Sequence, residues 1–343
     1  MSDVRKSESR PNFTPAWKSH AEHYKDALKY MLDRRNGDVY SFKTPWPKFN
    51  NASTQGIEFN TITVIGGRPA SGKTLLVDQM VREGFALNPG LNLRVLQFQF
   101  EMLGRSSKLR EFSAVAKKTY KYLCSAEDEG VVITKEVFDK CKNYAATAAK
   151  YPIDIIDTPL PVEEIKNQIV NYMNHHATII GGKKIYHNTV ITLDHTVLVK
   201  KVKGEANKNE TLYNLGEMCT ELKKLYPIAF ILLTQLNRDI DRPERNEPGK
   251  YGNYVLESDI FGADAILQHA DLVAGINRPA KRFIKVYGPE RYLIEDDSVL
   301  VVHWLKSRNG EVGMSFFKAE FHNMRIVEMD TPGQETLTTK GKQ

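Results

Sequence analysis

The sequence predicts an α/β protein built on one doubly wound, mostly parallel sheet that ends in a C-terminal hairpin. Between residues 61 and 237, short apolar strands alternate with amphipathic helical segments, which is the pattern of parallel strands joined by crossover helices. The first strand runs directly into a glycine-rich turn and then a helix. Near the C-terminus, the apolar strand 298–304 is followed by a second at 314–319, and we expect these two to pair as the hairpin.

The glycine-rich turn after the first strand matches a phosphate-binding loop. The pattern G-x-x-x-x-G-K-[ST] is filled by Gly67, Gly72, Lys73 and Thr74, with Arg68, Pro69, Ala70 and Ser71 between them. Glycines let the backbone approach phosphates, the helix N-terminus adds a positive dipole end, and Lys73 neutralises the β- and γ-phosphates. The Thr74 hydroxyl is placed to bind Mg²⁺. A lysine-bearing turn before an ordinary helix is the alternative, but the strand–loop–helix order favours nucleotide binding.

The remaining elements follow from their apolar periodicity and from the residues that interrupt it. After the loop we expect a helix over 75–85, a strand over 93–100, mixed helical sequence over 105–150, a strand over 151–157, a helix over 162–176, a strand over 189–193, a helix over 210–225 and a strand over 228–233. The last of these is the most apolar strand of the chain.

Composition limits the class of protein. A chain of 343 residues could hold two average domains, although α/β domains often use about 250 residues alone. Its three cysteines show no C-x-x-C spacing, which indicates a reducing compartment and no zinc site. We find neither a signal-peptide core nor a long apolar run, so we expect a soluble, cytoplasmic protein without membrane contact. The net charge of +6 is compatible with a polyanionic partner without requiring one.

The N-terminal part stands apart from the sheet. Residues 1–18 are polar and charged, and we expect them to be a disordered tail. Residues 19–55 are expected to form a helix and an extended arm, and the helix carries an apolar stripe made of Tyr24, Leu28, Met31 and Leu32. This stripe must be buried either on the chain's own domain or on a neighbouring subunit. The sequence leaves both possibilities open.

Two carboxylates follow apolar strands at the edge where open α/β sheets bind their ligands. Glu101 comes just after strand 93–100, and Asp194 ends strand 189–193. A carboxylate in the second position can hold the water shell of Mg²⁺, and the phosphate loop favours this over a strand-capping role. For Glu101, position alone leaves an ordinary loop carboxylate as the alternative.

Two polar segments follow later strands. Lys200, Lys201 and Lys203 crowd a loop after Asp194, and such a loop is either simply solvated or grips nucleic-acid phosphates. The strand over 228–233 leads into Gln235 and then Arg238, after which residues 239–255 are rich in proline, glycine and charge. A long loop of this kind is either functional or mobile.

Taken together, seven ordered segments resemble one family. These are GGRPASGKT (66–74), FQFEM (98–102), YPIDIIDTPLPVEEI (151–165), VITLDH (190–195), LLTQLNR (232–238), DIFGADAILQHAD (259–271) and KSRNG (306–310). In this order they resemble the RecA-like motor domain of DnaB-type hexameric replicative DNA helicases. The resemblance covers residues 20–327, including the linker helix. It implies a RecA-like ATPase domain over 56–330, followed by a polar tail over 331–343.

The resemblance implies specific roles for residues of this chain. Lys73 and Thr74 match the phosphate and Mg²⁺ ligands, and Asp194 matches the Walker B acid. Glu101 matches the base that activates water, and Gln235 matches the sensor that couples the γ-phosphate to the DNA-binding loops. Lys306 and Arg308 match a basic pair that reaches a neighbour's ATP, with Arg308 as the arginine finger. ATP and Mg²⁺ would thus bind between subunits of a homo-oligomer, expected to be a hexameric ring. Single-stranded DNA would be held by loops near Lys200 and Arg238.

Two departures from the family pattern stand out. The family usually begins with a helical domain that recruits primase, whereas only about 20 residues precede the linker helix here. We therefore expect that domain to be absent, and we draw no expectation of primase or loader contacts. Where many members have a DNA-gripping arginine, this chain has Phe261. Its ring could stack on a base or belong to the core, and the sequence leaves both open.

Three other functions share these features. A RecA-family recombinase would use the same loop and sheet in an open filament. A DnaB-like ATPase of a mobile element, such as a phage, or of a defence system would hydrolyse ATP without unwinding a fork. A nucleotide-binding scaffold without activity is the least favoured, because Glu101, Gln235 and Arg308 would then have no use.

Overall fold

The computed structural model describes residues 17–39, 41–125, 132–247 and 254–335, and it divides into two units at Tyr40. In the first unit, helix α1 spans His20–Asn36. Ser19 and Glu22 form a capping box at its start, and Gly37 ends it in the left-handed conformation. The helix predicted from the apolar periodicity is therefore confirmed. Its apolar stripe is exposed within this unit.

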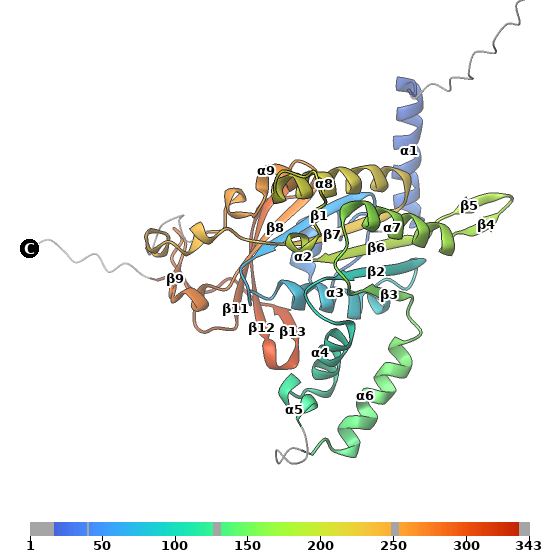
Figure 1. Cartoon of the computed structure of the whole chain (residues 1–343). Coiled ribbons are helices and arrows are strands. Elements are labelled where there is room, and N and C mark those ends of the chain that lie inside the picture. Colours follow the sequence, from blue (N-terminus) through green and yellow to red (C-terminus); the bar gives the residue numbers. More distant parts are fainter. Residues whose placement is uncertain (1–16, 40, 126–131, 248–253, 336–343) are drawn as a thin grey trace, which may run out of the picture. The chain divides into compact units, whose positions relative to one another are not determined.

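The described residues of the second unit form one nine-stranded sheet in the order β13-β12-β11-β8-β1-β7-β6-β2-β3 (Figure 1). Its parallel strands are β1 (Thr61–Gly67), β2 (Leu93–Gln99), β3 (Ile153–Ile156), β6 (Asn188–Asp194), β7 (Ile228–Gln235) and β8 (Leu272–Asn277). The antiparallel strands are β11 (Val299–Ser307), β12 (Gly313–Glu320) and β13 (Arg325–Glu328). The predicted doubly wound, mostly parallel sheet with a C-terminal hairpin is confirmed.

Helices cover both faces of the sheet (Figure 1). The larger ones are α3 (Lys73–Leu87), α4 (Gly104–Ala116), α6 (Lys135–Ala148), α7 (Val162–His176) and α8 (Lys208–Leu225). The short ones are α2 (Pro47–Asn51), α5 (Tyr120–Cys124) and α9 (Ala263–Ile266).

The helices on the two faces bury separate hydrophobic clusters. Helices α7 and α8 pack on one cluster with Val64, whereas α3 packs on the other with Ile65. Neighbouring residues of β1 thus point to opposite faces, as side chains of a strand must. This double burial explains why the central strands read as continuous apolar runs.

The extended arm before the sheet belongs to the second unit from residue 41 onward. Phe42, Trp46 and Phe49 are buried in the cluster that α3 covers. The indole N–H of Trp46 donates to the carbonyl of Ile326 in β13 at 3.0 Å. The arm therefore ties the start of the domain to the far edge of its sheet.

Several strands are not predicted from the sequence. Strand β8 lies between β1 and β11 and is buried along its whole length, but its letters LVAGIN form only a short apolar run containing Gly275. That glycine is required, because a Cβ there would lie 2.5 Å from Val255 Cγ1. The other unpredicted strands are shorter still: β13 and the pairs β4 (Thr178–Ile180) with β5 (Lys183–Ile185) and β9 (Val286–Tyr287) with β10 (Tyr292–Leu293).

The two predicted tails fall mainly on residues 1–16 and 336–343, which lie outside the described residues. The described start of the C-terminal tail contacts the domain. Leu293 N–H donates to the carbonyl of Gly333 at 2.8 Å, and Arg291 forms an ion pair with Glu335.

Candidate active site

The phosphate loop lies at the C-terminal edge of the parallel strands. It leaves β1 at Gly67 and enters α3 at Lys73. Ala70 and Gly72 have positive φ values of 59° and 96°, which curl the loop back toward the helix N-terminus. A Cβ on Gly67 would lie 2.4 Å from Ser71 Oγ and 2.9 Å from Lys73 Cγ. The first glycine of the pattern is therefore required by the close approach of the loop to itself.

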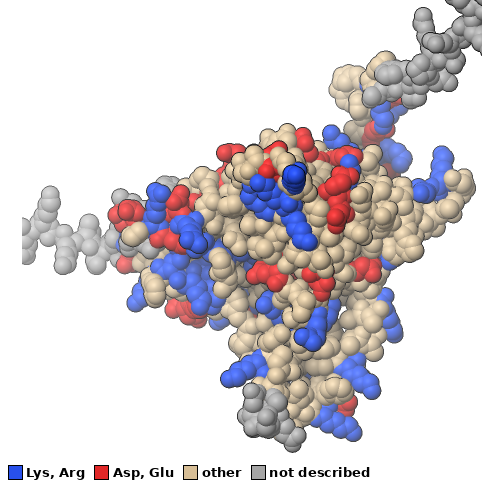
Figure 2. All heavy atoms as spheres, viewed as in Figure 1, with Lys and Arg blue, Asp and Glu red and all other residues tan. Residues whose placement is uncertain are grey.

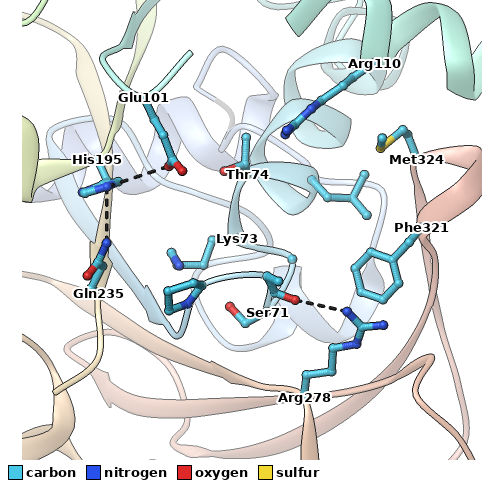
Figure 3. A pocket seen from close by; sticks show the side chains of 14 residues that line it. Ser71, Lys73, Thr74, Glu101, Arg110, His195, Gln235, Arg278, Phe321 and Met324 are labelled. Atoms are coloured by element: carbon cyan, nitrogen blue, oxygen red, sulfur yellow. Dashed lines mark hydrogen bonds and ion pairs between the residues drawn. The ribbon is translucent and has the colours of Figure 1, made fainter. Parts of the chain in front are cut away.

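Lys73 is held at the base of this loop (Figure 3). Its ammonium donates to the carbonyls of Gly67 at 2.7 Å and Arg68 at 3.1 Å. Burial lowers the pKa of Lys73 to about 8, against the opposing attraction of Asp194 and Glu101. Among the described residues, this buried ammonium bonds to carbonyls and forms no direct ion pair with a carboxylate. It is therefore poised to bind an anion such as a phosphate.

Thr74 and Asp194 form a second part of the site. The Thr74 hydroxyl donates to Asp194 Oδ2 at 2.7 Å. Asp194 ends β6, and burial raises the pKa of its carboxyl group. Its Oδ1 is buried and has no hydrogen-bond partner among the described residues. A hydroxyl beside a carboxylate with an unused oxygen is the donor set that Mg²⁺ prefers, so these residues fit the predicted ion.

Three neighbouring strands place a row of side chains opposite the loop (Figure 3). Glu101 follows β2, His195 follows β6, and Gln235 ends β7. His195 Nε2 lies 3.8 Å from Glu101 Oε2 and 3.4 Å from Gln235 Nε2. Burial lowers the pKa of His195, which favours its neutral imidazole. Since the Glu101 side chain is 61% exposed, its carboxylate is open to the cavity.

The sequence interpretation did not include His195, although it directly follows Asp194. The signal was present, because a polar residue at the end of a buried strand lies at the ligand edge of the sheet. The structure adds the contacts that assign it to this row.

The far end of the cavity combines apolar and aromatic side chains with two arginines. The cavity encloses about 490 Å³ and is lined by Pro69, Ala70, Ser71, Gly72, Lys73, Thr74, Leu75, Glu101, Arg110, His195, Gln235, Arg278, Phe321 and Met324. The Arg278 guanidinium lies 3.8 Å from the centroid of the Phe321 ring and donates to the carbonyl of Ala70 at 3.3 Å. A planar cation against an aromatic ring suits a flat, polarisable base. Arg110, Arg278, Phe321 and Met324 were missed, because they belong to no motif and come from α4 or from segments after β8 and β12.

The predicted basic pair lies elsewhere. Lys306 and Arg308 are not among the described residues that line this cavity. The Lys306 ammonium donates to the carbonyl of Leu267 at 2.6 Å. Arg308 is half exposed, and its Nε lies 3.4 Å from Asp271 Oδ1. Within one chain, the structure brings together Lys73, Thr74, Glu101, Asp194 and Gln235 and leaves this pair outside.

The candidate DNA contacts are spread over two loops. Lys200, Lys201 and Lys203 are exposed after β6, and Arg238 is exposed at the start of a 3-10 turn, η3 (Arg238–Asp241). Phe261 is half-buried and packs against the hydrophobic cluster that α7 and α8 cover, and its N–H donates to the carbonyl of Gln235 at 2.9 Å. Of the two interpretations of Phe261, the structure supports the core contact.

Two features are absent from the described parts of the chain. No helix there is long and apolar enough to cross a membrane. The same residues hold no group of three or more His, Cys, Asp or Glu side chains arranged to bind a metal ion. Cys124 is exposed, Cys141 and Cys219 are buried, and all three are free thiols.

The fold and the site define an α/β nucleotide-binding protein with a phosphate loop. Residues 42–326 match the model of the family described as "DnaB-like helicase C terminal domain". The chain belongs to this family, so the resemblance seen in the sequence is confirmed.

Individual relatives agree with this assignment. The chain is 24% identical over 357 residues to "Replicative DNA helicase DnaB" of Helicobacter pylori, covering 92% of this chain and 67% of that protein. It is 24% identical to the protein of the same name from Buchnera aphidicola, covering 80% and 53%. It is 23% identical to "Probable replicative DNA helicase" of Trieres chinensis, covering 76% and 51%. The chain therefore spans half to two thirds of the length of these curated relatives.

Solved structures share the fold. One that is described as an ATPase domain superimposes with a TM-score of 0.73 at 14% identity, covering 91% of this chain and all of that one. A DnaB-like replicative helicase, solved to describe its interactions with primase, gives a TM-score of 0.70 at 16% identity, covering 89% and 66%. At such identities the likeness establishes the RecA-like fold.

Proposed function

We propose that this chain is the motor of a DnaB-type helicase, which hydrolyses ATP between neighbouring copies and moves along single-stranded DNA. One observation carries this proposal. Lys73, Thr74, Glu101 and Gln235 line one cavity and Asp194 accepts a hydrogen bond from Thr74 behind its wall, while Lys306 and Arg308 of the same chain lie outside it. The names of the curated relatives favour the replicative motor over a recombinase or a repurposed ATPase.

The phosphate end of the site is supplied by the chain itself. Lys73 would exchange its bonds to the carbonyls of Gly67 and Arg68 for bonds to the β- and γ-phosphate oxygens of ATP. Thr74 and Asp194 would hold Mg²⁺ through the Thr74 hydroxyl and the unused Asp194 oxygen. When bound, Mg²⁺ neutralises charge that develops on the phosphate oxygens.

Glu101 would orient and deprotonate the attacking water. Its carboxylate is exposed to the cavity, and its pocket neighbours Lys73 and Gln235 define the space where a γ-phosphate would lie. His195, whose pKa is lowered by burial, lies between Glu101 and Gln235. Gln235 would sense the γ-phosphate and pass its presence to the segment that follows β7.

At the opposite end, the base of the nucleotide would lie near Arg278 and Phe321. These two side chains already form a stacked pair at the cavity wall. A base could stack on either member, because every base offers a flat π-face. This contact would fix the nucleotide without strong selection among bases.

The missing positive charge would come from a second copy. Arg308 is half exposed on the described surface, and Lys306 precedes it on the same strand end. An arginine supplied by a neighbour contributes about 10³–10⁵ in rate to phosphoryl transfer. The exposed apolar stripe of α1 fits the same view, since it would be buried on a neighbouring subunit. We propose a hexameric ring.

The strand of DNA would be held by its phosphates. Lys200, Lys201, Lys203 and Arg238 are exposed on the two loops that follow β6 and β7, next to Asp194 and Gln235. Phe261 is not included in this set, because it packs against the core. We place the assembled motor in the cytoplasm.

The experiment is an ATPase assay over a range of protein concentrations, with and without a short single-stranded DNA. Turnover per chain should rise with concentration as interfaces form, and DNA should raise it further. Closed six-fold rings should appear by electron microscopy with an ATP analogue. Turnover per chain that is independent of both concentration and DNA would overturn the proposal.

A further inference from the structure

A second pocket lies on the other side of the phosphate loop. It encloses about 470 Å³ and shares Pro69, Ala70, Ser71 and Arg278 with the nucleotide cavity. Its other lining residues are Arg68, Asp241, Asn277, Lys281, Arg282 and Phe283. The phosphate loop is thus a wall between two pockets, and only one of them has been assigned to ATP.

Positive charge dominates this second pocket. Four basic side chains, Arg68, Arg278, Lys281 and Arg282, line it. Two carboxylates are paired with them. Asp241 lies 2.5 Å from Arg68 Nη2 and 3.5 Å from Arg282 Nε.

The second carboxylate, Asp297, lies 2.5 Å from Arg278 Nη2 and 3.7 Å from Lys281 Nζ. Each carboxylate is therefore shared between two cations, which leaves the group with an excess of positive charge. Figure 2 shows Lys and Arg side chains gathered over the part of the surface that Figure 1 labels β9. The 3-10 turn η7 (Pro279–Arg282), which supplies Lys281 and Arg282 to the pocket, precedes β9 in the chain. Such a site favours a phosphate group.

Phe283 lines the pocket, and its side chain is not packed into the core of the described residues. Its side chain is 93% exposed, although large aromatic side chains are usually buried. Its φ of 58° is left-handed, a conformation that is strained for a residue with a Cβ. Its N–H donates to the carbonyl of Ala280, which ends η7 and fixes this backbone. Strained, exposed positions of this kind cluster where a ligand is bound.

We propose that the second pocket and Phe283 bind single-stranded nucleic acid, with a phosphate near Lys281 and Arg282 and a base stacked on the Phe283 ring. A basic groove beside an exposed aromatic ring is how proteins bind single strands without reading sequence. A free polyphosphate would use the charge but would have no need of the ring. This inference rests on the proposed DNA motor and names a contact for its strand. ATP and DNA would then bind to opposite sides of one loop.

The test measures the binding of a fluorescent oligothymidine to the full-length chain by anisotropy. Phe283→Ala and Phe283→Leu should weaken binding about fivefold or more, because stacking on one base is lost. Phe283→Tyr keeps the ring and should bind like the parent. The matched control is Phe138→Ala. Phe138 is an exposed phenylalanine of α6 and is not among the residues that line either pocket. Melting temperatures report whether each variant is folded.

A second variant tests the phosphate contact without altering the ring. Lys281→Ala should reduce the salt dependence of binding by about 0.7 in the log–log slope. Lys183→Ala, on the exposed β4–β5 pair, should leave this slope unchanged.

The outcomes separate this inference from the proposed function. A parent chain that does not bind the oligonucleotide overturns both. A parent that binds, with Phe283→Ala and Lys281→Ala equal to it, overturns only the second pocket. Parent-like binding by Phe283→Leu would also overturn the second pocket. A leucine can replace an apolar contact, but it cannot replace a ring that stacks on a base.

Discussion

The nucleotide cavity and the segment that carries Lys306 and Arg308 differ in how far one chain completes them. In the cavity, a loop and three strand ends bring together cation, hydroxyl and carboxylates within one domain. The end of β11 is tied to its own chain by the bond from Lys306 to the carbonyl of Leu267. Arg308, just after the strand, pairs with Asp271 and stays half exposed. In the proposed mechanism, the folded chain therefore contains a binding site for ATP but lacks the charge that hydrolysis requires. That difference makes assembly part of the mechanism.

The largest effect should come from the cavity itself. Lys73→Ala should abolish ATP hydrolysis and strongly weaken nucleotide binding, because the β- and γ-phosphates lose their buried partner. Turnover and the affinity for a fluorescent ATP analogue measure the two effects. Lys150→Ala, at an exposed lysine after α6, is the control. Near-normal turnover of Lys73→Ala would refute the assignment of the phosphate loop.

Arg308 should separate binding from hydrolysis. Arg308→Ala should lower kcat about 10³–10⁵-fold while ATP binds with nearly unchanged affinity, because the guanidinium acts on a neighbour's transition state. Single-turnover kinetics and equilibrium titration distinguish the two. A loss of affinity as large as the loss of rate would place Arg308 in its own chain's binding site.

Glu101 tests the water-activating role. Glu101→Gln should reduce hydrolysis about 10²–10⁴-fold and keep nucleotide binding and assembly, since an amide cannot accept the proton of water. Glu290→Gln, at a carboxylate outside the cavity, is the control. Should nucleotide affinity collapse while the residual rate stays the same, Glu101 is a structural residue.

Removal of α1 tests where its stripe is buried. Deleting residues 1–36 should leave a folded domain that assembles poorly, if Tyr24, Leu28, Met31 and Leu32 pack on a neighbour. Sedimentation measures assembly, and the melting temperature reports folding. A cooperative loss of structure on deletion would instead mean that the helix packs on its own domain.

The smallest expected effect is a pH dependence. Burial lowers the pKa of Lys73 to about 8 in the free protein, and phosphate binding requires its charged form. Above that pH the neutral amine must take up a proton before phosphate binds, so affinity should fall by at most about tenfold per pH unit. Below that pH, Lys73 is already protonated, so its contribution to nucleotide affinity should not change with pH. Titrations between about pH 7 and 9.5 span this pKa and its upper limb, and constant affinity throughout would contradict the shift.

Sequence patterns predict the parts of the site that are local. Gly67 to Thr74 lie in one loop, and Asp194 and Glu101 each follow a continuous apolar strand, so their place at the sheet edge follows from the chain alone. Arg278 and Phe321 reach the cavity from segments far beyond the loop in the sequence. No sequence pattern predicts that Arg278 and Phe321 line the cavity, because a site made by tertiary packing depends on the order of the strands in the sheet.

Strand β8 explains why the position of Arg278 and the separation of the basic pair from the cavity were not predicted. Its run of six residues includes Gly275, which lowers the strand signal, yet it lies beside β1 and carries Arg278 just past its end. Because β8 separates β1 from β11, it also sets how far the Lys306–Arg308 segment lies from the chain's own phosphate loop. The split between the cavity and the basic pair therefore follows from a strand that sequence periodicity alone does not predict.

The central claim is that ATP is hydrolysed between two copies, and mixing two inactive variants tests it directly. Lys73→Ala keeps an intact Arg308, and Arg308→Ala keeps an intact phosphate loop. When the two variants are unfolded or dissociated, mixed and reassembled, some interfaces combine the intact phosphate loop of one variant with the intact Arg308 of the other. The mixture should recover ATP hydrolysis that neither variant shows alone. Activity no greater than the sum of the separate variants, in mixed assemblies verified by two-colour labelling, would contradict the account.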